Sequence, residues 1–309
     1  MAVKIFSGSA TIYLAEKIAH AYGEPLGKVN YQQFSDGEMS PFIAESVRGH
    51  DVFVVQSTFP PADNLLELLL MVDAAKRASA SNVNVLIPYF GYARQDRKDK
   101  PRVSIAAKLI ANLLSAAGAD RIMACDLHAD QIQGFFDIPF DHLYGSYIFV
   151  PYLKSLGLKD LMFATPDVGG IKRARSFAKF FDSDLAVCDK YRKEANKVSS
   201  MRLIGEVEGK EVVLVDDLVD TAGTICKAAA LLKEKGAKSV RAICTHPVLS
   251  ANAYENIEGS VLEELVVADT IPLKQASSKI KVLSVSDLFA KAIRKIHDHE
   301  SISSLFISL

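Results

Sequence analysis

Two adjacent carboxylates, Asp216 and Asp217, are followed closely by the loop Asp220-Thr-Ala-Gly-Thr224. Such a loop of small and hydroxyl residues at the start of a helix offers backbone N–H groups and the positive end of the helix dipole to a phosphate. Paired acids suit sugar hydroxyls, or a Mg²⁺ ion that arrives with its ligand. A site for a phosphate beside a site for a polyol is what a sugar phosphate requires.

The flanking sequence predicts the elements that hold this loop. The apolar, mostly β-branched run Val212–Val215 predicts a buried strand that ends at the acid pair. The residues from Ile225 onward predict a helix over 224–235 that ends at Gly236. Two plainer interpretations stay open, because strand-Asp-Asp patterns also occur in response regulators and Walker-type sites, and because the acids could merely start a helix.

Polar residues follow three other predicted strands. Ligands of open parallel sheets gather beyond the C-terminal ends of the strands, so these residues predict one shared site. Each also has a plainer interpretation by itself: His128 as a capping or core histidine, Asp167 as the cap of a helix over 171–181, and Arg94 as part of a solvated loop. The strands and the segments that follow them are 83–88 with Arg94-Gln95-Asp96-Arg97, 121–125 with Asp126-Leu-His128, and 161–164 with Asp167-Val-Gly-Gly170.

Strand-like and helix-like runs alternate along the chain, which predicts an α/β fold with mainly parallel sheets flanked by helices. A weak internal repeat favours two copies of one fold, since Asp51–Gln56 and the helix and strand after it correspond to Glu211–Asp216 and its successors. The first copy lacks the acids and the Gly-Thr turn, so we expect it to keep only the scaffold. We expect domains at 1–146 and 147–309, with a tail helix after about residue 285 that could pack back on the first domain.

Length and composition bound the class of protein. The 309 residues, 49% hydrophobic and 24% charged, suit two globular domains of ordinary size. A net charge of −1 gives no global basic field, so we expect neither nucleic-acid nor membrane binding. The four cysteines lack metal-like spacing and indicate free thiols in a reducing compartment. Met1–Ala10 lacks the pattern of a secretory signal, and Leu65–Val72 is too short to span a bilayer, so we expect a cytoplasmic protein.

The run 212–228 resembles the phosphoribosyl pyrophosphate-binding motif of type I phosphoribosyltransferases and of ribose-phosphate pyrophosphokinases. Those families often carry a second glycine where this chain has Ala222. Alanine is tolerated there if it keeps a negative φ, and we therefore expect a negative φ at Ala222.

Further segments resemble the ribose-phosphate pyrophosphokinase family along nearly the whole chain, whereas a phosphoribosyltransferase would share only the 212–228 motif. The resemblance implies two tandem type I phosphoribosyltransferase-like domains. It also implies an enzyme of nucleotide biosynthesis that transfers the β,γ-diphosphoryl group of Mg-ATP to the anomeric hydroxyl of ribose 5-phosphate. The segments are Phe34-Ser-Asp36-Gly37-Glu38, Pro88–Asp96, Asp126-Leu-His128, Gln131–Phe136 and Asp167-Val-Gly-Gly170.

The resemblance also implies binding roles. Mg²⁺ would be engaged by His128 and Asp167, and part of the ATP site would come from a neighbouring subunit. The residues implied to bind ATP are Phe34, Asp36, Gly37, Glu38, Arg94, Gln95, Asp96 and His128. Those implied to bind ribose 5-phosphate are Arg192, Asp216, Asp217, Asp220, Thr221, Ala222, Gly223 and Thr224.

The segment 189–197 has the composition of a basic surface loop. In the family that it resembles, this is the catalytic loop, and Lys190 and Arg192 match its Lys-x-Arg core. Tyr191 and Glu194 depart from the family pattern, which leaves Lys193 as a candidate for a further cation.

The family's phosphate-activated, ADP-inhibited class is a homohexamer built from dimers, with an effector site between subunits. We therefore expect a homo-oligomer with phosphate and ADP as effectors. Two alternatives remain: a phosphoribosyltransferase that requires a nucleobase, and a non-catalytic regulatory homologue. The residues that match effector-phosphate ligands are Arg48, Ser79, Lys100, Arg102, Ser301 and Ser303.

Overall fold

The computed structural model describes residues 2–191 and 200–306, and the side chains of residues 190–200 lie outside that description. The chain divides into two compact units, Met1–Tyr144 with Ser284–Phe306 and Gly145–Leu283. The tail Ser284–Phe306 thus groups with the first unit. From the sequence we expected a second domain of 147–309, with a tail helix that could pack back on the first domain.

Buried apolar runs build the central sheet of the first unit. Val52–Val55 is fully buried, as expected for parallel strands that are covered on both faces. The elements of this unit are β1 (Val3–Ser7), η1 (Ser9–Thr11), α1 (Ile12–Tyr22), β2 (Val29–Gln33), β3 (Met39–Ile43), β4 (Asp51–Val55), α2 (Asp63–Arg77), β5 (Asn82–Ile87), α3 (Ala106–Ala117), β6 (Arg121–Cys125), η2 (Asp130–Phe135), β7 (Phe140–Leu143), α8 (Ser286–His297) and η3 (Ile302–Leu305). The sheet has the order β1-β4-β5-β6-β7 with every neighbouring pair parallel, and β2 and β3 form a separate antiparallel hairpin.

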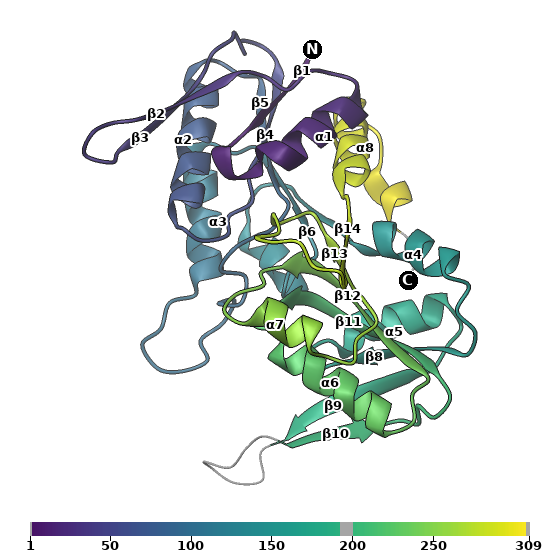
Figure 1. The fold of residues 1–309 in the computed structure, drawn as a ribbon. Helices are drawn as coiled ribbons and strands as arrows, with labels where there is room; N and C mark the ends of the chain where they lie inside the picture. The colour runs from purple at the N-terminus through teal and green to yellow at the C-terminus, as the bar shows by residue number, and fades with distance from the viewer. Residues whose placement is uncertain (1, 192–199, 307–309) are drawn as a thin grey trace. The chain divides into compact units, whose positions relative to one another are not determined.

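The tail helix α8 belongs to this unit because its apolar face is buried there. It lies beside α1, as Figure 1 shows, and buries Leu288, Phe289 and Ile293. At its C-terminal end, His297 Nδ1 lies 3.0 Å from Asp51 Oδ2. The Arg294 guanidinium stacks over the Tyr22 ring with 4.7 Å to the ring centroid.

The second unit repeats this plan with a longer sheet. Its elements are α4 (Ser146–Ser155), β8 (Leu161–Thr165), α5 (Ile171–Phe180), β9 (Leu185–Tyr191), β10 (Ser200–Ile204), β11 (Glu211–Val219), α6 (Gly223–Glu234), β12 (Ser239–Pro247), α7 (Ala253–Glu258), β13 (Leu265–Ala268) and β14 (Ile280–Leu283). The order is β10-β9-β8-β11-β12-β13-β14, and only the β10–β9 pair is antiparallel within the described residues. Helix α6 ends as expected before Gly236, whose φ of 90° suits glycine.

The two sheets share one strand order. The series β1-β4-β5-β6-β7 corresponds to β8-β11-β12-β13-β14. Helix α2 follows β4 in the chain, as α6 follows β11. The hairpin β2–β3 occupies the place in the chain that β9–β10 has in the second unit. The α/β fold with two copies of one mainly parallel, helix-flanked plan is therefore confirmed.

The predicted end of one strand is wrong. We expected Val212–Val215 to end at the acid pair, but β11 runs from Glu211 to Val219 and contains both acids. Pairing with β8 stops at Leu214, whereas pairing with β12 continues to Val219. The acids therefore lie where one neighbouring strand has ended and the other still supports the backbone.

Candidate functional site

The acid pair of β11 is held by a basic residue from α5. Arg173 Nη1 lies 3.0 Å from Asp217 Oδ1, and the Asp217 side chain is almost fully buried. The backbone N–H of Asp217 donates to Asp216 Oδ1 at 2.9 Å. These contacts fix the orientation of both carboxylates at the carboxyl edge of the sheet.

The electrostatic balance around the acids is unfavourable to negative charge. Burial, followed by the neighbouring Asp217, raises the pKa of Asp216 well above its usual range. Asp167 also raises the pKa of Asp216, and Arg173 opposes the shift. Sugar hydroxyl donors or a cation would relieve this accumulation of negative charge.

The loop Asp220–Thr224 joins β11 to α6. Ala222 has a φ of 60°, so the expected negative φ is wrong and alanine takes the left-handed conformation that favours glycine. The N–H of Cys226 donates to the Ala222 carbonyl at 3.0 Å and closes the first turn of α6. The hydroxyl residues Thr221 and Thr224 lie just before and within this turn, at the N-terminus of α6.

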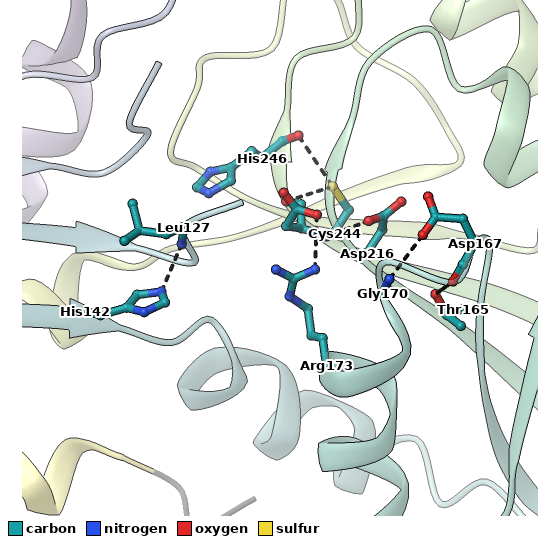
Figure 2. Close-up of polar contacts among 10 residues, drawn as sticks. Leu127, His142, Thr165, Asp167, Gly170, Arg173, Asp216, Cys244 and His246 are labelled. Carbon is teal, nitrogen blue, oxygen red and sulfur yellow. Dashed lines mark hydrogen bonds and ion pairs between the residues drawn. The ribbon is translucent and has the colours of Figure 1, made fainter. Parts of the chain in front are cut away.

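The loop after β8 packs tightly against the same edge. Thr165 Oγ1 donates to the Asp167 carbonyl at 2.8 Å, and Asp167 Oδ1 accepts the N–H of Gly170 at 3.1 Å (Figure 2). A Cβ at Gly170 would lie 2.3 Å from Thr165 Oγ1, so only glycine fits. Asp167 thus caps the turn into α5 and also contributes to the negative field at Asp216.

In the first unit, four of the residues implied to bind ATP lie at the tip of the hairpin β2–β3, and their side chains are exposed. Glu38 N–H donates to Asp36 Oδ1 at 3.1 Å, and Phe34 N–H donates to the Glu38 carbonyl at 2.8 Å. Gly37 has a φ of 99°, which the turn requires. Phe34 is 48% exposed, which presents an aromatic face to a ligand or to another chain.

Arg94, Gln95 and Asp96 follow β5 in an exposed segment. The path of this segment is set by Gly91, where a Cβ would lie 2.0 Å from the Thr58 carbonyl oxygen. Gln131 Nε2 donates to Asp96 Oδ2 at 3.0 Å, which ties the segment to η2.

His128 is exposed and follows β6. A histidine that sequence reasoning missed, His142 on β7, fixes the turn before it, because Leu127 N–H donates to His142 Nε2 at 2.9 Å (Figure 2). The proton of a neutral His142 ring then sits on Nδ1, which lies 3.7 Å from Asp130 Oδ1.

The two residues implied to be catalytic fall where the description stops. Lys190 has its backbone in β9, paired with Met201, but its side chain lies outside the described residues. Arg192 lies outside them entirely.

The residues implied to bind effectors fall into separate groups within the first unit. Arg48 Nη1 donates to Ser79 Oγ at 3.1 Å. The hydroxyls of Ser301 and Ser303 hydrogen-bond to each other at the start of η3. Lys100 and Arg102 are exposed in the segment between β5 and α3.

Two kinds of supporting residue escaped sequence reasoning. Arg173 had a usable signal in its position near the start of a helix. A cation there is unfavourable next to the positive end of the helix dipole, so a neighbouring acidic partner is expected. His246, at the end of β12, had no such signal, because its contact is with a residue in the turn after β13. Its Nδ1 lies 2.9 Å from Thr270 Oγ1, which itself donates to the Thr245 carbonyl at 3.0 Å.

Among residues 2–191 and 200–306, no group of three or more His, Cys, Asp or Glu side chains is arranged to hold a metal ion. Over the same residues, no helix has the length and apolar character needed to cross a membrane.

A parallel sheet with an acid pair at its carboxyl edge, followed by a small-residue loop that opens a helix, is the arrangement of the type I phosphoribosyltransferase fold. Family models agree with this class. A model of the N-terminal domain of ribose phosphate pyrophosphokinase matches residues 3–118, and one of the phosphoribosyl synthetase-associated domain matches residues 192–307.

Relatives and a solved structure cover nearly the whole chain. A ribose-phosphate pyrophosphokinase of Porphyromonas gingivalis is 57% identical over 98% of this chain and 97% of its own, and one of Wolinella succinogenes is 58% identical over 98% and 99%. The crystal structure of phosphoribosylpyrophosphate synthetase from Mycobacterium smegmatis superposes with a TM-score of 0.91 at 37% identity, covering 97% of this chain and all of that one. The chain therefore belongs to the ribose-phosphate pyrophosphokinase family and is a transferase of nucleotide biosynthesis.

Proposed function

We propose that the chain transfers the β,γ-diphosphoryl group of Mg-ATP to the anomeric hydroxyl of ribose 5-phosphate, giving phosphoribosyl pyrophosphate and AMP. The observation that carries this proposal is the direct succession, on β11 and α6, of a buried acid pair and a phosphate-accepting loop. A sugar that carries a phosphate matches both halves of that segment.

The second unit would bind ribose 5-phosphate. Asp216 and Asp217 would accept hydrogen bonds from ribose hydroxyls, because carboxylates are strong acceptors, with Asp217 held by Arg173 and Asp216 held by the Asp217 N–H. The backbone N–H groups and hydroxyls of Thr221–Thr224 would receive the 5-phosphate at the N-terminus of α6. Arg192 would add a cation to the same site.

In the transfer, the anomeric oxygen forms a bond to the β-phosphorus, and the bond from that phosphorus to the bridging oxygen of AMP breaks. Lys190 and Arg192 would stabilise the charge on the transferring diphosphoryl group, because such reactions depend mainly on positioning and electrostatics.

A Mg²⁺ ion would arrive with its nucleotide, because Mg²⁺ is usually held by one or two carboxylates together with phosphates and water. The raised pKa of Asp216, caused by burial and by nearby carboxylates, marks a place that a cation would stabilise. Asp167 would serve as a carboxylate ligand and His128 would contact the Mg-ATP complex. The ion would neutralise charge on the phosphates.

ATP would use the first unit. Gln95 can offer a donor and an acceptor to the base edge, and Arg94 can stack on it. The exposed hairpin tip at 34–38 would complete the site from a neighbouring subunit, since its aromatic and acidic side chains are exposed to solvent. This arrangement requires a homo-oligomer, and we propose the hexamer built from dimers.

Phosphate and ADP would act as effectors in the first unit. Hydroxyls and cations from several segments suit an oxyanion, and Arg48 already contacts Ser79. The serine pair at the start of η3 would supply further hydroxyls. In Ser301→Ala/Ser303→Ala, we expect activation by phosphate and inhibition by ADP to be lost, measured as initial rates at fixed substrate concentrations. Full activity of the wild type in phosphate-free buffer would contradict this role.

The reaction itself is tested with purified protein, Mg-ATP and ribose 5-phosphate, followed by ³¹P NMR. The expected products are AMP and phosphoribosyl pyrophosphate in equal amounts. Formation of ADP would show transfer of one phosphoryl group instead of two. A requirement for a nucleobase would point to a phosphoribosyltransferase, and absence of any product would point to a regulatory homologue.

A further inference from the structure

The segment that follows β12 extends along the loop 220–224. Leu249 N–H donates to the Val219 carbonyl at 3.0 Å, and Ser250 N–H donates to the Asp220 carbonyl at 3.0 Å. The parallel pairing of β11 with β12 is therefore continued by backbone contacts into the loop itself. The loop has a fixed neighbour on this side before any ligand is bound.

Two side chains from this segment and from α7 add contacts to consecutive residues of the loop. The Ser250 hydroxyl donates to Asp220 Oδ1. Asn256 Nδ2 donates to the Thr221 carbonyl at 2.9 Å. The first of these bonds orients the carboxylate of the loop, and the second fixes the peptide that precedes Ala222.

The backbone on both sides of this contact is held in an unusual conformation. Ala222 has a φ of 60°, Leu249 a φ of 44° and Ala251 a φ of 48°, all in the left-handed region. Non-glycine residues keep such conformations only where the surrounding structure determines them, and such strain gathers at functional sites. The bonds from Ser250 and Asn256 are side-chain contacts that adjoin this strained backbone.

The supporting segment is itself anchored in the core of the second unit. Leu249, Ala253 and Ile257 are buried in the same hydrophobic cluster as β11 and α6. Tyr254 is also buried there, and its hydroxyl accepts the N–H of Lys274 at 3.0 Å. The side chains of Ser250 and Asn256 therefore extend from a fixed base toward the loop.

We propose that Ser250 and Asn256 are positioning residues for the ribose 5-phosphate site, which hold the loop 220–224 in its phosphate-accepting shape before the sugar phosphate binds. This inference rests on the proposed function of the loop. A loop ordered in advance does not lose conformational freedom on binding, so affinity is higher. Removing either side chain should therefore raise the KM for ribose 5-phosphate more than it changes kcat or the KM for ATP.

The test uses the full-length protein and variants that keep the net charge. Asn256→Ala removes an exposed side chain, and Asn252→Ala is its matched control, because Asn252 lies at the start of the same helix and makes no side-chain capping bond. Ser250→Ala removes the hydroxyl, and Ser250→Thr keeps one. Each variant is measured by amide hydrogen exchange of residues 221–224 without ligand and by steady-state kinetics with Mg-ATP and ribose 5-phosphate.

We expect faster exchange in the loop and a KM for ribose 5-phosphate raised about threefold to tenfold in Asn256→Ala and in Ser250→Ala, which is the loss of about one hydrogen bond. Asn252→Ala should match the wild type, and Ser250→Thr should recover most of the affinity. Unchanged exchange in both alanine variants would overturn the proposal whatever the kinetics. Faster exchange with a raised KM for ATP alone would also overturn the proposal. It would show that the loop 220–224 does not bind ribose 5-phosphate as assigned.

Discussion

Replacing Arg173 with methionine removes the cation beside Asp217 and leaves a buried carboxylate next to Asp216. Arg173 Nη1 lies 3.0 Å from Asp217 Oδ1, and the side chains are 23% exposed for Arg173 and 6% exposed for Asp217. Removing one partner of a fully buried pair costs about 3–5 kcal/mol. Because the arginine is partly exposed, we expect about 2–3 kcal/mol for this substitution, which lowers the Tm by about 4–12 °C.

Thermal denaturation followed by circular dichroism measures this loss, with Arg175→Met as the control, because Arg175 is an exposed residue of the same helix. The control should change stability by less than about 0.5 kcal/mol. The cost of Arg173→Met should shrink in an Asp217→Asn background. Equal Tm values for Arg173→Met and Arg175→Met would refute the assigned role of the ion pair.

Three further predictions follow from local geometry. Ala222→Gly should be nearly neutral for stability, because relief of about 1–2 kcal/mol of left-handed strain offsets the flexibility of glycine and the lost methyl group. The control, Ala230→Gly on the exposed face of α6, should lower the free energy of unfolding by about 1 kcal/mol. Equal losses of stability for the two variants in urea denaturation would contradict the φ of Ala222. Burial and Asp217 raise the folded pKa of Asp216, so its contribution to stability is present below the unfolded pKa and is lost as pH rises through the folded value. Asp216→Asn should therefore raise the Tm at neutral pH, with the gain disappearing on acidification, and a gain that grew in acid would be inconsistent with this sign. Because the Thr270 hydroxyl donates to the Thr245 carbonyl, Nδ1 of His246 should donate to Thr270, and ¹⁵N NMR should find a proton on Nδ1. An Nδ1 without a proton would reject the hydrogen-bond assignment.

The sequence predicted those parts of the fold that depend on local pattern. Buried apolar runs located β4, β5, β6 and β8 closely, and the loop 220–224 could be placed between a strand and a helix because its residue types have direct chemical preferences. The repeated plan also followed from pattern, since the same order of strand, loop and helix recurs in both halves.

Features that depend on a partner from elsewhere in the chain could not be predicted in this way. The extension of β11 to Val219 arises from pairing with β12 after β8 has ended, which no periodicity within β11 records. The left-handed Ala222 is stable only within its surroundings, and its sequence neighbours favour no such conformation. His142 and Asn256 act through single hydrogen bonds to distant backbone atoms, so neither residue type nor spacing distinguishes them from ordinary core or surface residues.

The central claim is that the segment 216–224 binds ribose 5-phosphate, and direct titration calorimetry tests it without turnover. Ribose 5-phosphate and a non-hydrolysable Mg-ATP analogue are titrated separately into the wild type and Thr224→Val, which removes one hydroxyl at the start of α6 and keeps the side-chain shape. We predict an affinity for ribose 5-phosphate that falls about tenfold, with unchanged affinity for the analogue. Unchanged ribose 5-phosphate binding together with weaker binding of the ATP analogue would contradict the account.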